Sequence, residues 1–331
     1  MLVLTRREIQ RTISMREAIE AVKAAYLACF TGEASVPKRT TIHLAETRGI
    51  SQVLPSSLTK MGVFGAKLVS VFFDNPRQGL PLVSAMIVLQ DGSTGRPMAI
   101  MDGNLPTAIK TGAATGAATE VLARGGSESA GLIGTGYQAA WQLEAICEVR
   151  PGIREILVFD VDKDKARGFA REMESFLSRF HVRVTHAESP EQAVRGRDII
   201  VTVTTSTTPV FDGEWISPGV HVNAVGSFTP EMQEIDEKTV MKADKIVTDV
   251  REEALEMTGD LIVPIRKGVV AAGVIHAEMG EVLAGQRPAR EREDEITLFE
   301  SVGLSALDVA VAKRIYQNAS DRGIGHQIEL N

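Results

Sequence analysis

The chain has 331 residues, of which 44% are hydrophobic and 24% are charged, a composition typical of a globular protein. Its length predicts about two domains, and its net charge of −7 provides no basic field for nucleic acid or an anionic membrane. With only Cys29 and Cys147, a disulfide framework and a cysteine-rich metal site are excluded, and both thiols are expected to fill core positions. The N-terminus turns polar at Thr5, and no run of about 18 apolar residues occurs, so we expect a cytoplasmic protein without a membrane partner.

The first third of the chain combines one amphipathic helix with strands. Apolar residues on one face predict a helix from Arg16 to Phe30. A polar loop leads into strands expected at 50–54, 63–73 and 82–89, the last ended by a turn at Asp91-Gly92-Ser93. These runs indicate a mixed sheet. The alanine-rich segment from Thr107 to Ala123 predicts a closely packed helix, and we place the crossover between domains there.

Beyond this crossover the pattern changes to alternating strands and helices. Strands are expected at 130–133, 155–160, 182–184, 198–203, 220–225 and 245–250, and helices at 138–147, 163–176 and 190–195. Such alternation predicts an α/β domain with a doubly wound parallel sheet. A further amphipathic helix ends near Ala319.

A glycine loop follows the first of these strands, in Gly131-Leu132-Ile133-Gly134-Thr135-Gly136-Tyr137-Gln138-Ala139. Gly134 permits a tight turn, Gly136 permits close approach of the backbone to a pyrophosphate, and Ala139 permits close packing of helix on sheet. Asp160 ends the second strand at about the distance expected of a ribose-binding acid. The pattern predicts a dinucleotide site in which NAD is favoured. NADP stays possible, because a basic side chain among Lys163, Lys165 and Arg167 could receive a 2′-phosphate.

Polar residues follow later strands of the same predicted sheet. In a parallel sheet, ligands lie beyond the carboxyl ends of the strands. Thr204-Thr205-Ser206 and Gly226-Ser227 occupy two such ends and are candidates for the cofactor rim. The six histidines show no paired metal spacing, so no metal site is expected, and His221 is interpreted as a packed or hydrogen-bonded histidine. Asp102 and Asp260 are interpreted as capping or turn-stabilising residues.

Motifs over nearly the whole chain resemble the ornithine cyclodeaminase and mu-crystallin family. They are Pro37-Lys38-Arg39, Gly65-Ala66-Lys67-Leu68-Val69, Gly79-Leu80-Pro81, Thr94-Gly95-Arg96-Pro97-Met98-Ala99, Thr107-Ala108-Ile109-Lys110-Thr111-Gly112-Ala113, the glycine loop, Val225-Gly226-Ser227, Glu234-Ile235-Asp236, Gly259-Asp260, Glu278-Met279-Gly280-Glu281-Val282 and Ser301-Val302-Gly303. The resemblance implies an α+β domain for substrate binding and dimerisation at 1–112 and 305–331, a Rossmann-type domain at 113–304, and a homodimer.

The resemblance also assigns roles to individual residues. Arg39 matches an arginine that holds the substrate carboxylate, and Lys67 matches the lysine at the reacting centre, which binds substrate and takes part in proton transfer. Lys110 stands where members commonly have a second carboxylate-binding arginine, so the bidentate fork is lost there. The glycine loop and the strand ends described above already provide several candidate cofactor residues. The resemblance adds Thr111, Tyr137, Gln138, Val225, Ser301 and Gly303.

Two departures from the family pattern bear on the reaction. Phe228 stands where the cyclodeaminases have an aspartate, and Leu82 stands where they have a threonine. Without that carboxylate, the amine chemistry of cyclodeamination lacks its acid or base. We therefore expect Phe228 to contact a substrate that is already an imine, and NAD(P)H to reduce Δ1-pyrroline-2-carboxylate or Δ1-piperideine-2-carboxylate. Alanine dehydrogenation, residual cyclodeaminase activity and nucleotide-dependent ligand carriage stay open as alternatives.

Overall fold

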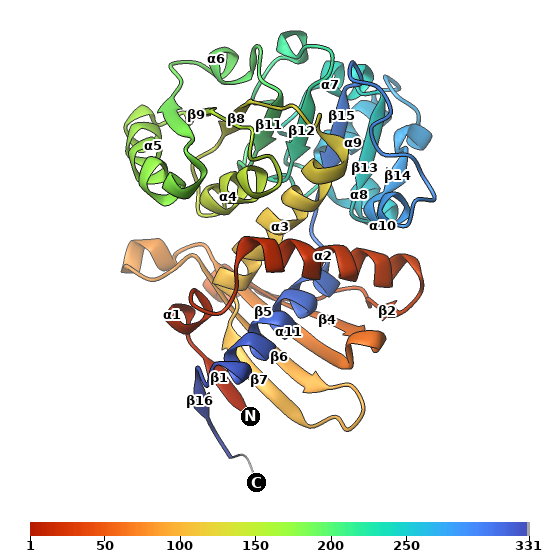
Figure 1. Cartoon of the computed structure of the whole chain (residues 1–331). Helices are drawn as coiled ribbons and strands as arrows, with labels where there is room; N and C mark the ends of the chain where they lie inside the picture. Colours follow the sequence, from red (N-terminus) through yellow and green to blue (C-terminus); the bar gives the residue numbers. More distant parts are fainter. Residues whose placement is uncertain (330–331) are drawn as a thin grey trace. The chain divides into compact units, whose positions relative to one another are not determined.

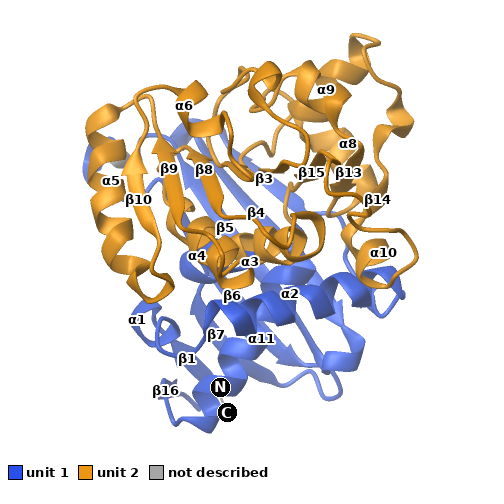
Figure 2. Cartoon of the chain, turned by 45° about the horizontal axis from the view of Figure 1, so that its top comes forward, with its two compact units in different colours: residues 1–110, 304–331 blue, residues 111–303 orange. Residues whose placement is uncertain are grey.

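The computed structural model describes residues 1–329 and divides into two compact units, drawn in different colours in Figure 2. Unit 1 comprises Met1–Lys110 with Leu304–Asn331, and unit 2 comprises Thr111–Gly303. The borders predicted from the sequence lie after residue 112 and after residue 304, two residues and one residue beyond the borders of the structure. Residues 330–331 of the expected range 305–331 lie outside the described residues. Unit 1 thus joins the two ends of the chain, and unit 2 is continuous.

Unit 1 combines a sheet with a few helices (Figure 1). Its strands are β1 (Leu2–Leu4), β2 (Ala34–Ser35), β3 (Thr40–Leu44), β4 (Gly49–Leu58), β5 (Val63–Phe72), β6 (Val83–Asp91), β7 (Pro97–Asp102) and β16 (His326–Gln327). Its helices are α1 (Arg6–Ile9), α2 (Met15–Phe30) and α11 (Ser305–Asp321), with short 3-10 turns at Ala45–Thr47, Thr59–Met61 and Asn75–Gln78. Helix α3 (Asn104–Leu122) contains the border between the units.

The sheet of unit 1 is mixed, as predicted. Its order is β16-β1-β7-β6-β5-β4-β2, with β3 also paired to β4, and neighbours are antiparallel except for the parallel pair β1 and β7. Helix α2 begins with a capping box between Ser14 and Glu17 and buries the predicted apolar face, which includes Ile19 and Val22. Helix α11 packs against α2 and against β4, β5 and β6, so it covers one face of the sheet (Figure 1).

Unit 2 alternates strands and helices. Its strands are β8 (Ser129–Ile133), β9 (Glu155–Phe159), β10 (Arg183–His186), β11 (Ile199–Thr202), β12 (His221–Ala224), β13 (Lys245–Thr248), β14 (Ala277–Glu278) and β15 (Thr297–Glu300). Its helices are α4 (Ala139–Val149), α5 (Lys163–Phe176), α6 (Pro190–Val194), α7 (Glu237–Lys242), α8 (Arg251–Met257), α9 (Gly259–Arg266) and α10 (Met279–Leu283), with 3-10 turns at Ser178–Phe180, Gly213–Trp215 and Ala272–Val274.

The sheet of unit 2 is the predicted Rossmann-type parallel sheet. Its order is β10-β9-β8-β11-β12-β15-β13-β14, and every pair of neighbours is parallel. The strand order reverses between β8 and β11, because β9 and β10 lie on one side of β8 and the later strands lie on the other. This reversal point is where doubly wound sheets bind ligands. Strand β15 lies between β12 and β13 and is absent from the strands expected from the sequence.

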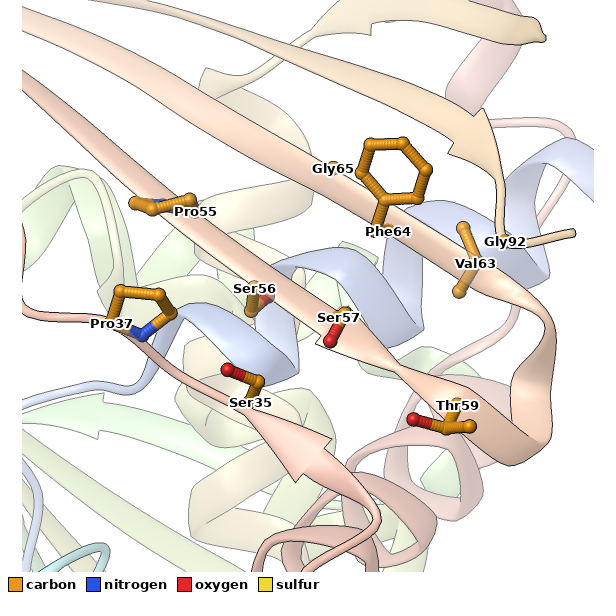
Figure 3. Close-up of a pocket in the computed structure, with 10 residues that line it drawn as sticks. All are labelled: Ser35, Pro37, Pro55, Ser56, Ser57, Thr59, Val63, Phe64, Gly65 and Gly92. Carbon is orange, nitrogen blue, oxygen red and sulfur yellow. The ribbon is translucent and has the colours of Figure 1, made fainter. Parts of the chain in front are cut away.

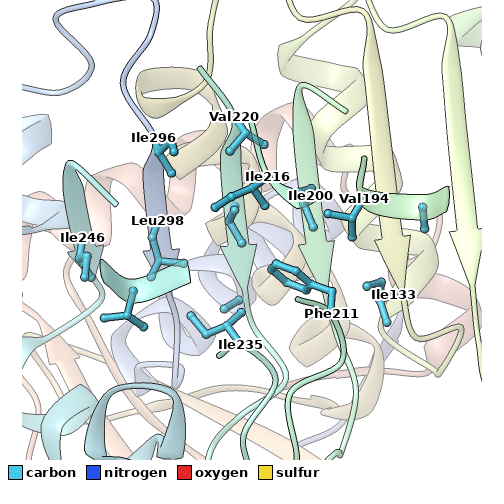
Figure 4. Close-up of a cluster of buried hydrophobic side chains, with 14 of the residues drawn as sticks. Ile133, Val194, Ile200, Phe211, Ile216, Val220, Ile235, Ile246, Ile296 and Leu298 are labelled. Carbon is cyan, nitrogen blue, oxygen red and sulfur yellow. The ribbon is translucent and has the colours of Figure 1, made fainter. Parts of the chain in front are cut away.

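Buried apolar clusters lie on both faces of this sheet. One contains Leu143 and Ile146 of α4 and Met173 of α5. The other contains Ile200, Leu298 and residues of α6, α7 and α9, and is shown in Figure 4. A sheet covered by helices on both faces explains why its strands are nearly continuous apolar runs in the sequence. Among the described helices, none is both long enough and apolar enough to cross a lipid bilayer.

Candidate active site

The glycine loop joins β8 to α4 at the reversal point of the sheet. Gly134 has a φ of +98°, and a Cβ atom there would lie 2.8 Å from the carbonyl oxygen of Val203, so only glycine fits the turn. Gly136 has open space instead, because a Cβ atom added there would meet no atom within 4 Å. The side chain of Gln138, at the N-cap position of α4, makes no capping hydrogen bond. The first turn of α4 can therefore offer backbone N–H groups to an anion.

A cavity of about 600 Å³ opens beside this loop within unit 2. Six of the predicted cofactor residues line it together: Gly134, Thr135, Gly136, Asp160, Thr204 and Thr205. Val161, Lys165, Ser206 and two prolines, Pro190 and Pro209, complete much of the lining. The volume, the open glycine backbone and the acid at the end of β9 fit the adenosine and pyrophosphate parts of a dinucleotide.

Asp160 is held firmly at the edge of this cavity. Its Oδ2 accepts hydrogen bonds from the backbone N–H and the hydroxyl of Thr135 at 2.9 and 2.7 Å, and lies 3.2 Å from Nζ of Lys165. Burial raises the pKa of Asp160, but the hydrogen bonds from Thr135, Asp162 and Lys165 outweigh burial and leave the pKa below its ordinary value. Asp160 is therefore ionised at neutral pH. Of the three basic residues considered for a 2′-phosphate, only Lys165 lines the cavity.

The loops after β11 and β12 are connected by one buried acid. The carboxylate of Glu234 accepts hydrogen bonds from the hydroxyl of Thr202 and from the backbone N–H groups of Thr204 and Gly226. Ser227 is buried, and its hydroxyl donates to the carbonyl of Met232 at 2.7 Å. These contacts fix the ends of both strands. Val225, Gly226 and Ser227 do not line the 600 Å³ cavity.

The other residues expected to bind cofactor lie elsewhere in unit 2. The carboxylate of Asp249 accepts hydrogen bonds from the hydroxyl of Ser301 at 2.6 Å and the N–H of Gly303 at 2.8 Å, which orders the segment after β15. Tyr137 is exposed and contacts Trp141, with 5.9 Å between ring centroids. Thr111 is half-buried on α3.

Unit 1 contains a buried group of charges, which we call the lysine–aspartate cluster: Lys67, Lys110 and Asp308. Nζ of Lys67 donates to both carboxylate oxygens of Asp308, at 3.1 and 2.9 Å. Nζ of Lys110 lies 3.9 Å from Oδ2 of the same carboxylate. Lys67 and Lys110 are only 7% and 4% exposed, and Asp308 is fully buried. Two ammonium groups thus share one carboxylate, which leaves an excess of positive charge that suits an anionic ligand.

Strand β5, helix α3 and helix α11 bring these three residues together. Lys67 lies opposite Leu54 of β4 and Ile87 of β6, so it is flanked by strands on both sides. Burial is the main influence on its pKa and lowers it, Asp308 acts in the opposite direction, and Lys110 and Arg39 lower the pKa further. The net pKa of Lys67 lies below its ordinary value, so the ammonium gives up its proton more readily than an exposed lysine.

Three further residues expected at the substrate lie near or outside this cluster. Arg39 is half-buried just before β3, and its charge acts on Lys67. Phe228 lies in unit 2 and is 51% exposed, and Leu82 of unit 1 is also exposed. No carboxylate occupies position 228, as the sequence already shows.

A second cavity, of about 380 Å³, lies within unit 1 (Figure 3). It is lined by Ser35 and Pro37 on one side and by residues of β4 and β5 on the other, including Ser57 and Phe64 (Figure 3). Among the described residues that line it, none has an ionisable side chain. It therefore provides no charge to bind a carboxylate, in contrast to the lysine–aspartate cluster.

Three buried carboxyl groups lie in the interior of unit 2, and we call Glu234, Asp260 and Glu300 the carboxyl cluster. Burial and then the charge of Glu234 raise the pKa of Asp260 to about 8. Burial and Asp260 raise the pKa of Glu300 well above its ordinary value. Asp260 accepts hydrogen bonds from the N–H groups of Glu234 and Ile235, whereas Thr258 caps its own helix, α9. Of the two interpretations of Asp260, capping of its own helix was wrong, because the side chain instead holds the backbone of another segment at Glu234 and Ile235.

Other sequence-based interpretations concern capping, histidine and metal sites. Asp102 accepts a hydrogen bond from the N–H of Leu105 at the start of α3, which confirms its capping role. His221 is fully buried between Thr297 and Asn223, which confirms a hydrogen-bonded histidine. Within residues 1–329, no group of three or more His, Cys, Asp or Glu side chains is arranged to hold a metal ion.

Sequence reasoning missed Asp308 and Glu234 as residues of the site. Asp308 left a signal, because it is an isolated acid between Leu307 and Val309 in an otherwise apolar helical turn. A buried helix face does not carry a charge without a partner. The partner, Lys67, lies 241 positions away in the sequence. The isolated acid therefore indicates a buried charged site, but the sequence does not identify its partner.

Comparisons with known proteins show which family the chain belongs to. The model of the ornithine cyclodeaminase/mu-crystallin family matches residues 1–323. The chain is 39% identical to a Delta(1)-pyrroline-2-carboxylate reductase of Bacillus cereus over 331 residues, all of both chains. It resembles the structure of the Thermococcus litoralis Delta(1)-pyrroline-2-carboxylate reductase in complex with NADH and L-proline, with a TM-score of 0.93, 42% identity and coverage of 99% of this chain and 100% of that one. It also resembles an archaeal alanine dehydrogenase dimer with bound NAD, with a TM-score of 0.90, 38% identity and coverage of 100% and 99%. The chain belongs to the ornithine cyclodeaminase/mu-crystallin family.

Proposed function

We propose that this protein is an oxidoreductase that uses NAD(P)H to reduce the C=N bond of a cyclic imino acid, Δ1-pyrroline-2-carboxylate or Δ1-piperideine-2-carboxylate, to proline or pipecolate. The observation that carries the proposal is the lysine–aspartate cluster, in which two buried ammonium groups share one carboxylate. This excess of positive charge suits the carboxylate of a small substrate. The similarity to reductases from Bacillus cereus and Thermococcus litoralis supports the same substrate class.

Each residue of the proposed substrate site has a separate role in the reaction. A reduced nicotinamide cofactor, when bound, supplies the hydride. Arg39 and Lys110 bind the substrate carboxylate and fix the orientation of the imine. Lys67 donates a proton from Nζ to the imine nitrogen, which makes the neighbouring carbon electrophilic, and its lowered pKa favours this transfer. Phe228 adds apolar surface where cyclodeamination would need a carboxylate.

The cofactor is held by the glycine loop and the 600 Å³ cavity in this proposal. Gly134, Thr135 and Gly136 approach the pyrophosphate, and Asp160 accepts hydrogen bonds from the ribose hydroxyls. An ionised Asp160 repels a 2′-phosphate, so NADH is preferred over NADPH. Lys165, which lies beside Asp160 in the lining, leaves some capacity for NADPH. Tyr137 and Gln138 precede α4, which begins at Ala139, and Thr204 and Thr205 form the opposite rim.

The remaining predicted cofactor contacts extend from the other strand ends of unit 2. Val225, Gly226 and Ser227 follow β12, and Ser301 and Gly303 follow β15; Thr111 lies on α3. Gly226 donates a hydrogen bond to Glu234, and Ser301 and Gly303 donate to Asp249, so the segments after both strands are tied to buried acids. We assign these segments to the part of the cofactor beyond the pyrophosphate.

A cytoplasmic location stays a prediction from the sequence.

The experiment that tests the function is a cofactor oxidation assay followed at the NADH absorbance. NADH and NADPH are each offered with either cyclic imine, without ammonium, and with pyruvate in the presence and absence of ammonium. We expect oxidation with a cyclic imine alone, preferentially of NADH, and its loss in Lys67→Ala. The exposed Lys60→Ala provides the matched control, since Lys60 lies outside the cluster.

Alanine dehydrogenation is the second candidate, because the archaeal alanine dehydrogenase is nearly as similar as the reductases. Turnover with pyruvate only when ammonium is present would replace the imine reductase proposal. Release of ammonia from ornithine would indicate cyclodeamination instead. Tight cofactor binding without turnover of any substrate would indicate a ligand carrier.

We also propose that the protein is a homodimer that pairs through the uncovered face of the unit 1 sheet. Leu68 lies opposite Val53 and Met86, and Ile42 lies opposite Ser51, two positions along β4 from Val53. Because side chains alternate along a strand, these residues share the face opposite to Lys67. Ile42 and Met86 are 52% and 48% exposed, which is unusual for an apolar sheet surface. A second copy of this chain would bury it.

Light scattering after size-exclusion chromatography tests the dimer. We expect Met86→Glu to convert the dimer to a monomer. Met241→Glu is the matched control, because Met241 is equally large, 62% exposed and located on α7 of unit 2. A monomeric unmodified protein would contradict the dimer, and a dimeric Met86→Glu protein would contradict this face.

A further inference from the structure

Asp308 is a buried acid near the C-terminal end of the chain, and it contacts Lys67, the proposed proton donor. It lies in the first turn of α11, fully buried, and both of its carboxylate oxygens accept from Nζ of Lys67. A carboxylate in the first turn of a helix interacts favourably with the helix dipole. The position of Asp308 thus brings its carboxylate close to both the N-terminus of α11 and Nζ of Lys67.

This carboxylate favours the protonated form of its neighbour. The charged groups that act on Lys67 are Asp308 from α11, Lys110 from α3 and Arg39 from the segment before β3. Burial, Lys110 and Arg39 all lower the pKa of Lys67, and Asp308 alone among these groups raises it. Without Asp308, burial and the two neighbouring cations would act unopposed and lower the pKa of Lys67 further.

The hydrogen bonds also fix where the ammonium points. A lysine Nζ carries three N–H donors on a flexible stem, and its position is lost when no partner holds it. The two contacts at 2.9 and 3.1 Å place Nζ between α11 and β5 and still leave donor capacity for a substrate nitrogen.

We propose that Asp308 is a positioning residue of the imine reduction, which holds Lys67 protonated and oriented so that its Nζ can give a proton to the substrate nitrogen. The inference rests on the proposed function. A bound nicotinamide cofactor would supply hydride to the imine carbon, the C=N π electrons would move to nitrogen, and nitrogen would take its proton from Nζ of Lys67. Lys67 is left as a neutral amine and takes its next proton from water, a recharging that the adjacent carboxylate of Asp308 favours.

The test is the pH profile of Asp308→Asn, which keeps the size of the side chain and removes its charge. We expect the alkaline limb of kcat to move to lower pH by about one unit or more, the usual effect of an adjacent opposite charge. Activity should approach that of the unmodified protein on acidification, because Lys67 is then protonated again. Binding of NADH should change less than twofold. Asp321→Asn, at the exposed end of the same helix, is the matched control and should leave the profile unchanged.

A second measurement does not depend on turnover. Labelling of lysines with trace acetic anhydride across pH, quantified at Lys67 by mass spectrometry, reports when the neutral amine appears. We expect labelling of Lys67 to begin at lower pH in Asp308→Asn and to remain unchanged at Lys60. A uniform loss of rate with an unchanged pH profile and unchanged labelling would overturn the proposal and indicate a purely structural role. If labelling shifts although no cyclic imine is reduced by the unmodified protein, the proposed function fails while the control of Lys67 by Asp308 stands.

Discussion

Gly136 offers a substitution that separates cofactor binding from folding. In Gly136→Ala, the new methyl group would meet no atom within 4 Å, and Gly136 is not among the residues with positive φ. Gly134→Ala, two positions earlier, would combine a φ of +98° with a contact of 2.8 Å to a backbone carbonyl. The two neighbouring glycines therefore differ in kind, and only Gly136 can be changed without disturbing the loop.

The magnitude of each effect follows from this geometry. An alanine in a compatible backbone conformation stabilises a protein by about 0.4 to 1 kcal/mol, because it restricts the unfolded chain. The melting temperature of Gly136→Ala should therefore stay the same or rise. The methyl group would instead occupy the space through which a pyrophosphate approaches the backbone. We expect at least a tenfold loss of NADH affinity, or about 1.4 kcal/mol of binding free energy.

Tryptophan fluorescence provides the binding assay, because Trp141, one of the two tryptophans of the chain, contacts Tyr137 of the loop. NADH is titrated into the unmodified protein, Gly136→Ala and the control Gly168→Ala, whose site on α5 is also open. Only Gly136→Ala should bind more weakly. Equal NADH affinity in all three proteins would refute the placement of the pyrophosphate, and a lower melting temperature of Gly136→Ala would refute the inference that the space at Gly136 is free.

Two further predictions concern acids of unit 2. Asp160→Ser removes the charge that disfavours a 2′-phosphate and leaves Lys165 in place. The ratio of kcat/KM for NADPH to kcat/KM for NADH should therefore rise at least about tenfold. An unchanged ratio in steady-state assays would contradict the role of Asp160. Asp260 has a pKa of about 8, above its ordinary value, so its stabilising contribution is full below about pH 4 and is lost as pH rises through 8. Between pH 5 and 7, the free energy of unfolding measured by urea titration should fall less steeply with pH in Asp260→Asn, by up to about 1.4 kcal/mol per pH unit. Equal slopes for the unmodified protein and Asp260→Asn would contradict the raised pKa.

The fold of unit 2 could be predicted well from the sequence because of its burial pattern. Strands covered on both faces appear as short apolar runs, and the polar loops between them mark their ends. Strand β15, Thr297–Glu300, escaped prediction, and two of its four residues are polar and buried. Strands β1 and β7 of unit 1 pair across about a hundred positions, and no local pattern signals such a pair.

The candidate site could be predicted only where its chemistry is local. The glycine loop and Asp160 belong to one strand–helix–strand unit, and their spacing shows their relation. Lys67 and Arg39 came from the family resemblance, since a single lysine or arginine in a strand or loop has no signature of its own. The partners that decide their charge come from distant segments, and the carboxyl cluster likewise joins β15, α9 and the loop before α7.

The discontinuous composition of unit 1 bears on how the protein is made. Unit 2 is a continuous segment and emerges from the ribosome with all of its strands present. Unit 1 must wait for α11, which covers β4, β5 and β6, and for β16, which pairs with β1. Domains fold as their chains become available during synthesis. Lys67 consequently gains its partner, Asp308, only after all of unit 2 has been made, and a chain interrupted before α11 has the parallel sheet of unit 2 without the pair of Lys67 and Asp308.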